Sequence, residues 1–222
     1  MFDKAGNAFV GDAGTKLINK FNPLGMLLNS TTVPVDGGII SIDLATDQKT
    51  AYYTSSFGVV HRADTSTNTV LSDFATFGGT AVAVRLLSDG GALVVQETQV
   101  LRLDSSGTVV KTYTGLTDAR HLYPLTLDPG GMSFWAGDVG RANNPYSGST
   151  KVYRVDIETG TILTTFQASK DGAPIVTGLA IFQGITQNPS PTQGTPEPAT
   201  FALAGLALLG TCVAKRKRLR IS

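Results

Sequence analysis

The stretch ALVVQETQVLRLDSSGTVVKTY, residues 92–113, contains three short apolar runs, at 92–96, 100–104 and 108–113. The last two runs are separated by the polar turn Ser105-Ser106-Gly107. Runs rich in β-branched and aromatic residues that are bounded by Gly, Asp and Ser are typical of strands joined by tight turns. We therefore predict three successive antiparallel strands in this stretch.

The same order of runs recurs along the chain. One set lies at 50–54, 59–64 and 69–74, another at 132–136, 152–156 and 161–166, and a looser one at 8–11, 17–22 and 26–28. A further apolar run precedes each of the three complete sets, at 39–44, 81–87 and 121–127, and a last one follows at 175–182. The body of the chain therefore reads as a repeat of strands, and no part of it has helical periodicity.

The repeat length identifies the architecture. Aspartates in equivalent turns recur at Asp3, Asp47, Asp89 and Asp128, so one unit is about 40 residues long. Four strands in about 40 residues is the pattern of a β-propeller blade. We predict an all-β fold, with about four blades of a β-propeller over residues 1–183.

The predicted strands can be assembled in two ways. A four-bladed ring results if the run at 175–182 supplies the inner strand that the first unit lacks. Alternatively, further blades and an export signal precede Met1, because Met1 opens directly onto a mid-blade turn, and a six- or seven-bladed parent then results. Both assemblies stay open at this point.

Three units share an Arg-x-Asp pair near the end of the third run, at Arg62/Asp64, Arg102/Asp104 and Arg154/Asp156. A charged ring would be a functional interpretation. Because the pair recurs in every complete unit, we expect a structural role, in which the aspartate caps turn amides and the arginine leans on a neighbouring strand.

Charge is distributed unevenly. Five of the 18 basic residues lie in the last eight positions, which leaves 13 basic residues against 17 acidic ones in the rest of the chain. A mildly acidic body argues against a nucleic-acid partner, because phosphate binding needs a basic face. The single cysteine, Cys212, lies in the tail, so the body has neither a disulfide nor a thiolate metal site.

The C-terminal tail begins after a Pro/Ser/Gln-rich linker at residues 184–195. Residues 199–214, ATFALAGLALLGTCVA, carry no charge, and as a helix they would be about 24 Å long against a hydrocarbon core of about 30 Å. We expect a transmembrane helix that snorkelling of its basic flank extends, rather than a buried core helix or an amphipathic surface helix. The anchoring side chains are Phe201, Leu203, Leu206, Leu208, Leu209 and Val213. The basic flank, expected on the cytoplasmic side, is Lys215, Arg216, Lys217, Arg218 and Arg220.

A Pro-Glu-Pro tripeptide, a short apolar segment and a basic cluster at the chain end resemble the PEP-CTERM sorting domain, here over residues 196–222. The resemblance implies export, recognition by an exosortase as processing enzyme, and a bacterial cell-envelope location with the body outside the membrane. Carried over to this chain, the sorting motif is Pro196, Glu197 and Pro198. The stretches at 2–14, 127–138 and 177–182 also resemble NHL-type bacterial propellers, which often carry such a tail.

The sequence predicts no catalytic constellation, no metal site and no cofactor. We expect His61 to be a partly exposed structural residue, and His121, just before an inner strand, has no second ligand in the other units. The long loop at 137–150 is the best candidate for ligand contacts, through Arg141, Asn143, Asn144 and Tyr146.

We therefore expect a non-enzymatic binding or scaffold module of the cell envelope, whose ligand is extracellular polysaccharide or a surface protein. The alternative is a propeller hydrolase or lyase that resembles the gluconolactonase type. Three or more convergent Asp, Glu, Asn or His side chains at the channel mouth would favour the enzyme.

Overall fold

The computed structural model describes residues 1–34, 37–116, 121–138, 151–168 and 178–179. The chain divides into two compact units, Met1–Thr186 and Gln187–Ser222, and the described residues all belong to the first. The predicted linker at 184–195, the tail at 196–222 and almost all of the run at 175–182 lie outside the described residues.

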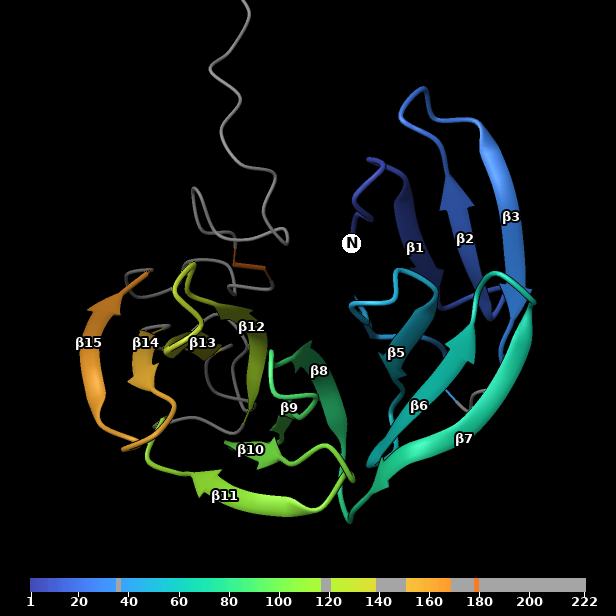
Figure 1. Cartoon of the computed structure of the whole chain (residues 1–222). Coiled ribbons are helices and arrows are strands. Elements are labelled where there is room, and N and C mark those ends of the chain that lie inside the picture. The colour runs from blue at the N-terminus through green and yellow to red at the C-terminus, as the bar shows by residue number, and fades with distance from the viewer. Residues whose placement is uncertain (35–36, 117–120, 139–150, 169–177, 180–222) are drawn as a thin grey trace, which may run out of the picture. The chain divides into compact units, whose positions relative to one another are not determined.

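Fifteen strands are present in the described part of the chain, and they form four antiparallel sheets, which we name sheets A to D in chain order (Figure 1). Sheet A contains β1 (Ala8–Asp12), β2 (Leu17–Phe21) and β3 (Leu27–Thr32). Sheet B contains β4 (Ser41–Leu44), β5 (Thr50–Thr54), β6 (Val59–Asp64) and β7 (Thr69–Thr76). Sheet C contains β8 (Ala81–Leu86), β9 (Ala92–Gln96), β10 (Gln99–Leu103) and β11 (Val109–Tyr113). Sheet D contains β12 (Leu122–Leu127), β13 (Ser133–Asp138), β14 (Lys151–Asp156) and β15 (Ile162–Gln167).

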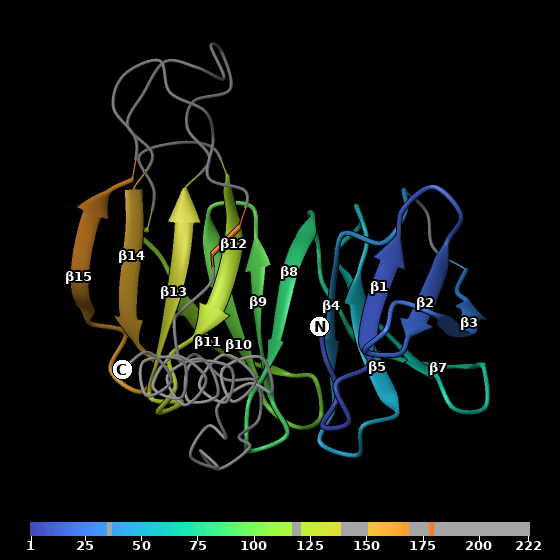
Figure 2. The same cartoon turned by 90° about the horizontal axis from the view of Figure 1, so that it is seen from above.

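Within each sheet the strands pair in the order in which they follow one another in the chain. The first strands of the complete sheets touch in succession, β4 against β8 and β8 against β12, and β1 also contacts β4. Figure 2, turned by 90° from Figure 1, shows the sheets standing side by side with β4, β8 and β12 next to one another. This is the blade arrangement of a β-propeller and confirms the all-β prediction.

Sheet A differs from the other three because it has three strands. It begins with the counterpart of β5, β9 and β13, as the sequence repeat predicts. Its third strand runs from Leu27 to Thr32, beyond the run predicted at 26–28. The polar residues of β3 stay in the strand because Asn29 and Thr31 hydrogen-bond to Asn68 of sheet B, a contact with no hydrophobic signature in the sequence.

The hydrophobic core consists of three clusters, each between successive sheets. Phe9 and Ile18 of sheet A pack with Tyr53 and Ala63 of sheet B. A second cluster joins sheets B and C, and a third joins sheets C and D. Sheets B and C therefore bury residues of both faces, one face against the sheet before and the other against the sheet after, so adjacent blades stabilise each other.

The third turn in each complete sheet is built as the repeat predicts. The Asp64 carboxylate accepts hydrogen bonds from the amides of Ser66 and Thr67, at 2.8 and 3.1 Å. Asp104 caps the amides of Ser106 and Thr108 in the same way, and Asp156 caps that of Thr159. The hydroxyls of Ser66 and Ser106, followed by these amides, hold the pKa of Asp64 and Asp104 below its usual value, and the amide and hydroxyl of Thr159 do the same for Asp156, so the three aspartates are ionised turn caps.

Candidate functional site

The sorting residues and the candidate ligand loop both fall outside the described residues. This holds for Pro196, Glu197 and Pro198, for the predicted anchor and basic flank, and for Arg141, Asn143, Asn144 and Tyr146. The structure does describe the strands on either side of that loop, β13 and β14, and the polar clusters of the body.

A cluster of Asp128, Trp135 and Arg154, which we call the Trp135 cluster, lies on sheet D. Asp128 Oδ2 accepts a hydrogen bond from Arg154 Nε at 2.6 Å, and Asp128 Oδ1 accepts one from Trp135 Nε1 at 2.8 Å. The guanidinium carbon of Arg154 is 5.8 Å from the centroid of the Trp135 ring, within cation–π range. Although burial opposes ionisation, hydrogen bonds from Ser133, Trp135 and Arg154 hold the pKa of Asp128 below its ordinary value.

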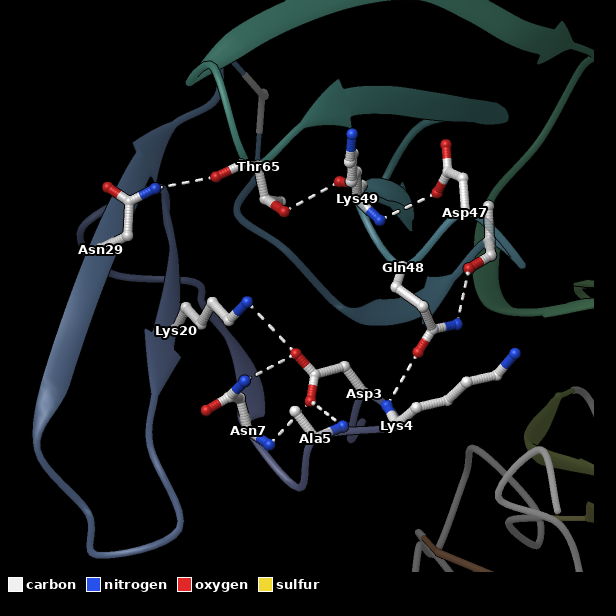
Figure 3. Close-up of polar contacts among 11 residues, drawn as sticks. Asp3, Lys4, Ala5, Asn7, Lys20, Asn29, Asp47, Gln48, Lys49 and Thr65 are labelled. Carbon is white, nitrogen blue, oxygen red and sulfur yellow. Dashed lines mark hydrogen bonds and ion pairs between the residues drawn. The ribbon is translucent and has the colours of Figure 1, made fainter. Parts of the chain in front are cut away.

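Related contacts occur on the other sheets. In sheet A, Lys20 Nζ is 3.2 Å from Asp3 Oδ2 and 5.0 Å from the centroid of the Phe9 ring. The Asp3 carboxylate also accepts bonds from Asn7, and two further bonds tie sheet A to sheet B: Lys4 N donates to Gln48 Oε1, and Asn29 Nδ2 donates to the Thr65 carbonyl (Figure 3). In sheets D and A the turn aspartate therefore meets a base on a later strand, Arg154 or Lys20, a contact that the sequence patterns did not show.

The equivalent arginines of sheets C and B have different partners. In sheet C, Arg102 Nη2 is 3.2 Å from Asp89, and Arg102 Nη1 also reaches Glu158 of sheet D at 2.6 Å. In sheet B, Arg62 bonds instead to the carbonyl and hydroxyl of Ser72. The arginines of the Arg-x-Asp pairs thus bind neighbouring strands and turns, and the described geometry gives them structural partners.

His61 of β6 lies between Ser55 and Asp73. His61 Nδ1 donates to Asp73 Oδ1 at 2.7 Å, and Ser55 Oγ is 3.4 Å from His61 Nε2. The imidazole also stacks on Tyr53, with ring centroids 5.1 Å apart. This order of groups resembles a Ser-His-Asp triad, but Ser55 is only 1% exposed, and a nucleophile has to reach its substrate.

Next to this trio, two buried hydroxyl groups, Tyr53 Oη and Thr54 Oγ1, have no hydrogen-bond partner. Burial is the main cause, and the negative charge of Asp73 the second, that raises the pKa of Tyr53 to about 12, so the phenol is neutral.

The first strands of sheets B and C are joined by polar side chains of β4. Asp43 Oδ2 accepts a hydrogen bond from the Leu86 amide at 2.8 Å, and Ser41 Oγ accepts one from the Val84 amide at 3.3 Å. Burial raises the pKa of Asp43, against the opposing charge of Arg85. Among the described residues, three or more acidic, histidine or cysteine side chains nowhere gather to hold a metal ion. His121 is exposed and directly precedes β12.

Nothing in the described part of the chain forms a helix with the length and apolarity that a membrane crossing requires. The predicted anchor at 199–214 is outside that part, so its span stays a prediction.

Comparison with known proteins finds matches for the C-terminal tail and for the fold of the body. The family model of the PEP-CTERM protein-sorting motif matches residues 195–218. A search of curated proteins finds no match. The fold resembles the WD40 beta propeller domain of Doa1, with a TM-score of 0.65 at 13% identity over 82% of this chain and 56% of that one. It also resembles Kuenenia stuttgartiensis Hydrazine Synthase, with a TM-score of 0.61 at 13% identity over 74% of this chain and 47% of that one.

The chain spans about half the length of the solved structures that it matches, and at this identity the likeness concerns the fold alone. The sorting motif implies an exported protein of the cell envelope with an exosortase as processing partner. Residues 195–218 are thus a PEP-CTERM protein-sorting motif, carried by a chain whose body has a β-propeller fold.

Proposed function

We propose that this chain is a non-enzymatic binding or scaffold module, which an exosortase delivers to the cell surface or extracellular polysaccharide. The observation that carries the proposal is the sorting motif at 195–218 attached to a body of propeller sheets. A rigid all-β body held off the membrane by a Pro-rich linker suits binding at a surface. The finer topology that we propose is a single membrane pass with the body outside and the basic flank inside.

The described polar groups support a binding role over catalysis because structural contacts already occupy them. Asp128 and Asp89 hold arginines, and Asp43 accepts bonds from two backbone amides. Ligand contact is assigned to the loop between β13 and β14, through Arg141, Asn143, Asn144 and Tyr146. Long loops on a rigid scaffold often carry the residues that bind a ligand.

The sorting part of the proposal is tested by fractionating cells that express an exosortase. Glu197→Gln removes the charge of the motif, and it is expected to leave the protein unprocessed in the membrane fraction. Gln193→Ala, in the linker just before the matched residues, is the control and should be processed like the parent chain. Unchanged processing of Glu197→Gln would refute the assignment of this tripeptide as the sorting signal.

The binding part is tested with the full chain in detergent against extracellular polysaccharide from an exosortase-encoding bacterium. Replacing Arg141 and Tyr146 together by alanine should abolish retention on the polysaccharide, whereas Lys16→Ala, in a turn of sheet A, should not. Equal retention of both variants would remove the loop as the binding site.

A second candidate function is hydrolysis of an ester or lactone, and the contact chain Ser55–His61–Asp73 is the observation that favours it. The burial of Ser55 is why we place it second. A fluorophosphonate probe, which reacts with activated serines, distinguishes the hydrolase from the binding module. Labelling that is lost in Ser55→Ala would establish the hydrolase, and absence of labelling is expected for the binding module.

A further inference from the structure

The outer strand of sheet B, β7, pairs with its neighbour differently from the outer strands of the other sheets. In sheets A, C and D the pairing of the last two strands shifts by a single residue, next to the turn that joins them. In sheet B the shift comes in mid-strand, where three residues of β7, Ser72, Asp73 and Phe74, lie opposite His61 alone. We call these three residues the β7 bulge. Bulges bend a strand and re-aim its side chains.

The β7 bulge has contacts on both faces of sheet B. On the face toward sheet A, Asp73 Oδ1 is 2.7 Å from His61 Nδ1, and the imidazole stacks on Tyr53, a member of the core shared with sheet A. On the face toward sheet C, Phe74 belongs to the core shared with sheet C and meets Tyr52 edge-on, with ring centroids 5.2 Å apart. Two adjacent residues of one strand therefore reach two different cores.

Two side chains of β6 hold the bulge. Arg62 Nε donates to the Ser72 carbonyl at 2.9 Å, Arg62 Nη2 donates to the Ser72 hydroxyl at 2.8 Å, and His61 holds the Asp73 carboxylate. Bulged residues leave the regular ladder of backbone hydrogen bonds, so side chains have to fix their position. Because Asp73 directly precedes Phe74, its bond to His61 limits how far the Phe74 carbonyl can move.

The third turn of sheet C packs against this carbonyl. A methyl group added at Gly107 would overlap the Phe74 carbonyl oxygen, so backbone lies directly on backbone there. The equivalent turn of sheet D meets side chains instead, because a methyl group at Gly160 would lie 3.4 Å from Lys111 and 3.6 Å from Tyr113. A side chain can rotate away, whereas a carbonyl moves only with its strand. The position of the sheet C turn therefore follows that of the bulge.

All of these sheet B and sheet C contacts lie within residues 37–116, which the structure describes without a gap. We propose that the β7 bulge is a conformational link through sheet B. The His61–Asp73 bond on the face toward sheet A fixes the Phe74 carbonyl, and with it the turn at 105–107 of sheet C on the opposite face. Loss of the bond lets the bulge relax, and the turn loosens although no residue of sheet C has changed.

The first test is hydrogen exchange of the full chain in mild detergent, read by mass spectrometry on peptides that cover residues 104–113. The Asp104 carboxylate protects the amides of Ser106 and Thr108 in this stretch. Asp73→Ala should speed their exchange at least about fivefold, the factor that corresponds to one lost hydrogen bond. Asp73→Asn keeps an acceptor oxygen for His61 and should exchange at the parent rate.

Asp47→Ala is the matched control for general loss of stability. It removes the acceptor of the Lys49 and Thr50 amides from the first turn of the same sheet, and it leaves the bulge intact. Residues 104–113 should therefore exchange in this variant at the parent rate. An unchanged rate in Asp73→Ala would overturn the proposal, and so would equal acceleration in Asp73→Ala and Asp47→Ala.

The second test asks whether the bulge sets the cost of a methyl group at Gly107. Gly107→Ala lowers the melting temperature because the methyl group overlaps the Phe74 carbonyl. In an Asp73→Ala background the relaxed bulge makes room, so the loss should fall to about half or less, whereas an Asp47→Ala background should show the full loss. Additive losses in the Asp73→Ala background would overturn the proposal. The exchange measurement decides without the Gly107 variant if that variant does not fold.

Discussion

Asp128 and Arg154 are joined by an ion pair of 2.6 Å between Oδ2 and Nε, although 26 residues separate them in the sequence. Asp128 lies in the turn between β12 and β13, the first turn of sheet D, and Arg154 lies on β14, its third strand. Asp3 with Lys20 and Asp89 with Arg102 repeat the pair in sheets A and C. In sheets A, C and D the turn aspartate thus pairs with a base two strands further along the blade, whereas in sheet B Arg62 bonds to Ser72 instead.

Arg154→Met should lower the free energy of unfolding by about 1–3 kcal/mol, because it leaves the largely buried Asp128 carboxylate without its base. Arg62→Met is the matched control, since Arg62 bonds to Ser72 rather than to a carboxylate, and it should cost less, about 0.5–1 kcal/mol. Urea unfolding of both variants measures the difference. Equal losses would mean that the ion pair adds nothing beyond packing.

Asp43 gives a pH dependence of known sign. Its pKa is raised by burial, so the folded state favours the protonated carboxyl, and ionisation on raising the pH above about 4 lowers stability. The stability of Asp43→Asn relative to the parent chain should therefore increase between pH 4 and pH 7. Urea unfolding at these two pH values tests this, and a difference that does not change with pH would contradict the raised pKa.

Gly107→Ala should destabilise the body by several kcal/mol, on the order of 3 or more, since a methyl group there would overlap the Phe74 carbonyl of sheet B. Gly115 has a similarly positive φ, +73° against +84°, but an added methyl group meets nothing within 4 Å. Gly115→Ala should therefore cost only about 1 kcal/mol. Comparing the two melting curves isolates the close approach of sheets B and C, and equal losses would show that backbone strain alone acts at Gly107.

Asp73→Ala should cost about 1–2 kcal/mol, because the His61 Nδ1–H then loses its acceptor. Asp73→Asn keeps an acceptor oxygen and should stay within about 0.5 kcal/mol of the parent chain. Chemical unfolding distinguishes the two. Identical stabilities for Ala and Asn would argue that the bond is not formed in solution.

The strands, the turns between them and the sorting motif can be predicted from the sequence by itself. Runs such as 92–96 and 100–104 predict strands β9 and β10 because side chains alternate between faces along a strand, a property of the local chain. The turn at 105–107 and its capping by Asp104 are local for the same reason. The sorting motif at 195–218 is also linear, because another protein reads it as a sequence.

Only the tertiary structure brought Ser55, His61 and Asp73 together across three strands and set Asp128 against Arg154. It also extended β3 through polar residues whose partner, Asn68, belongs to the next sheet. These contacts depend on how strands pair and how sheets pack against each other. The spacing of residues along one strand carries no information about the neighbour on its far side.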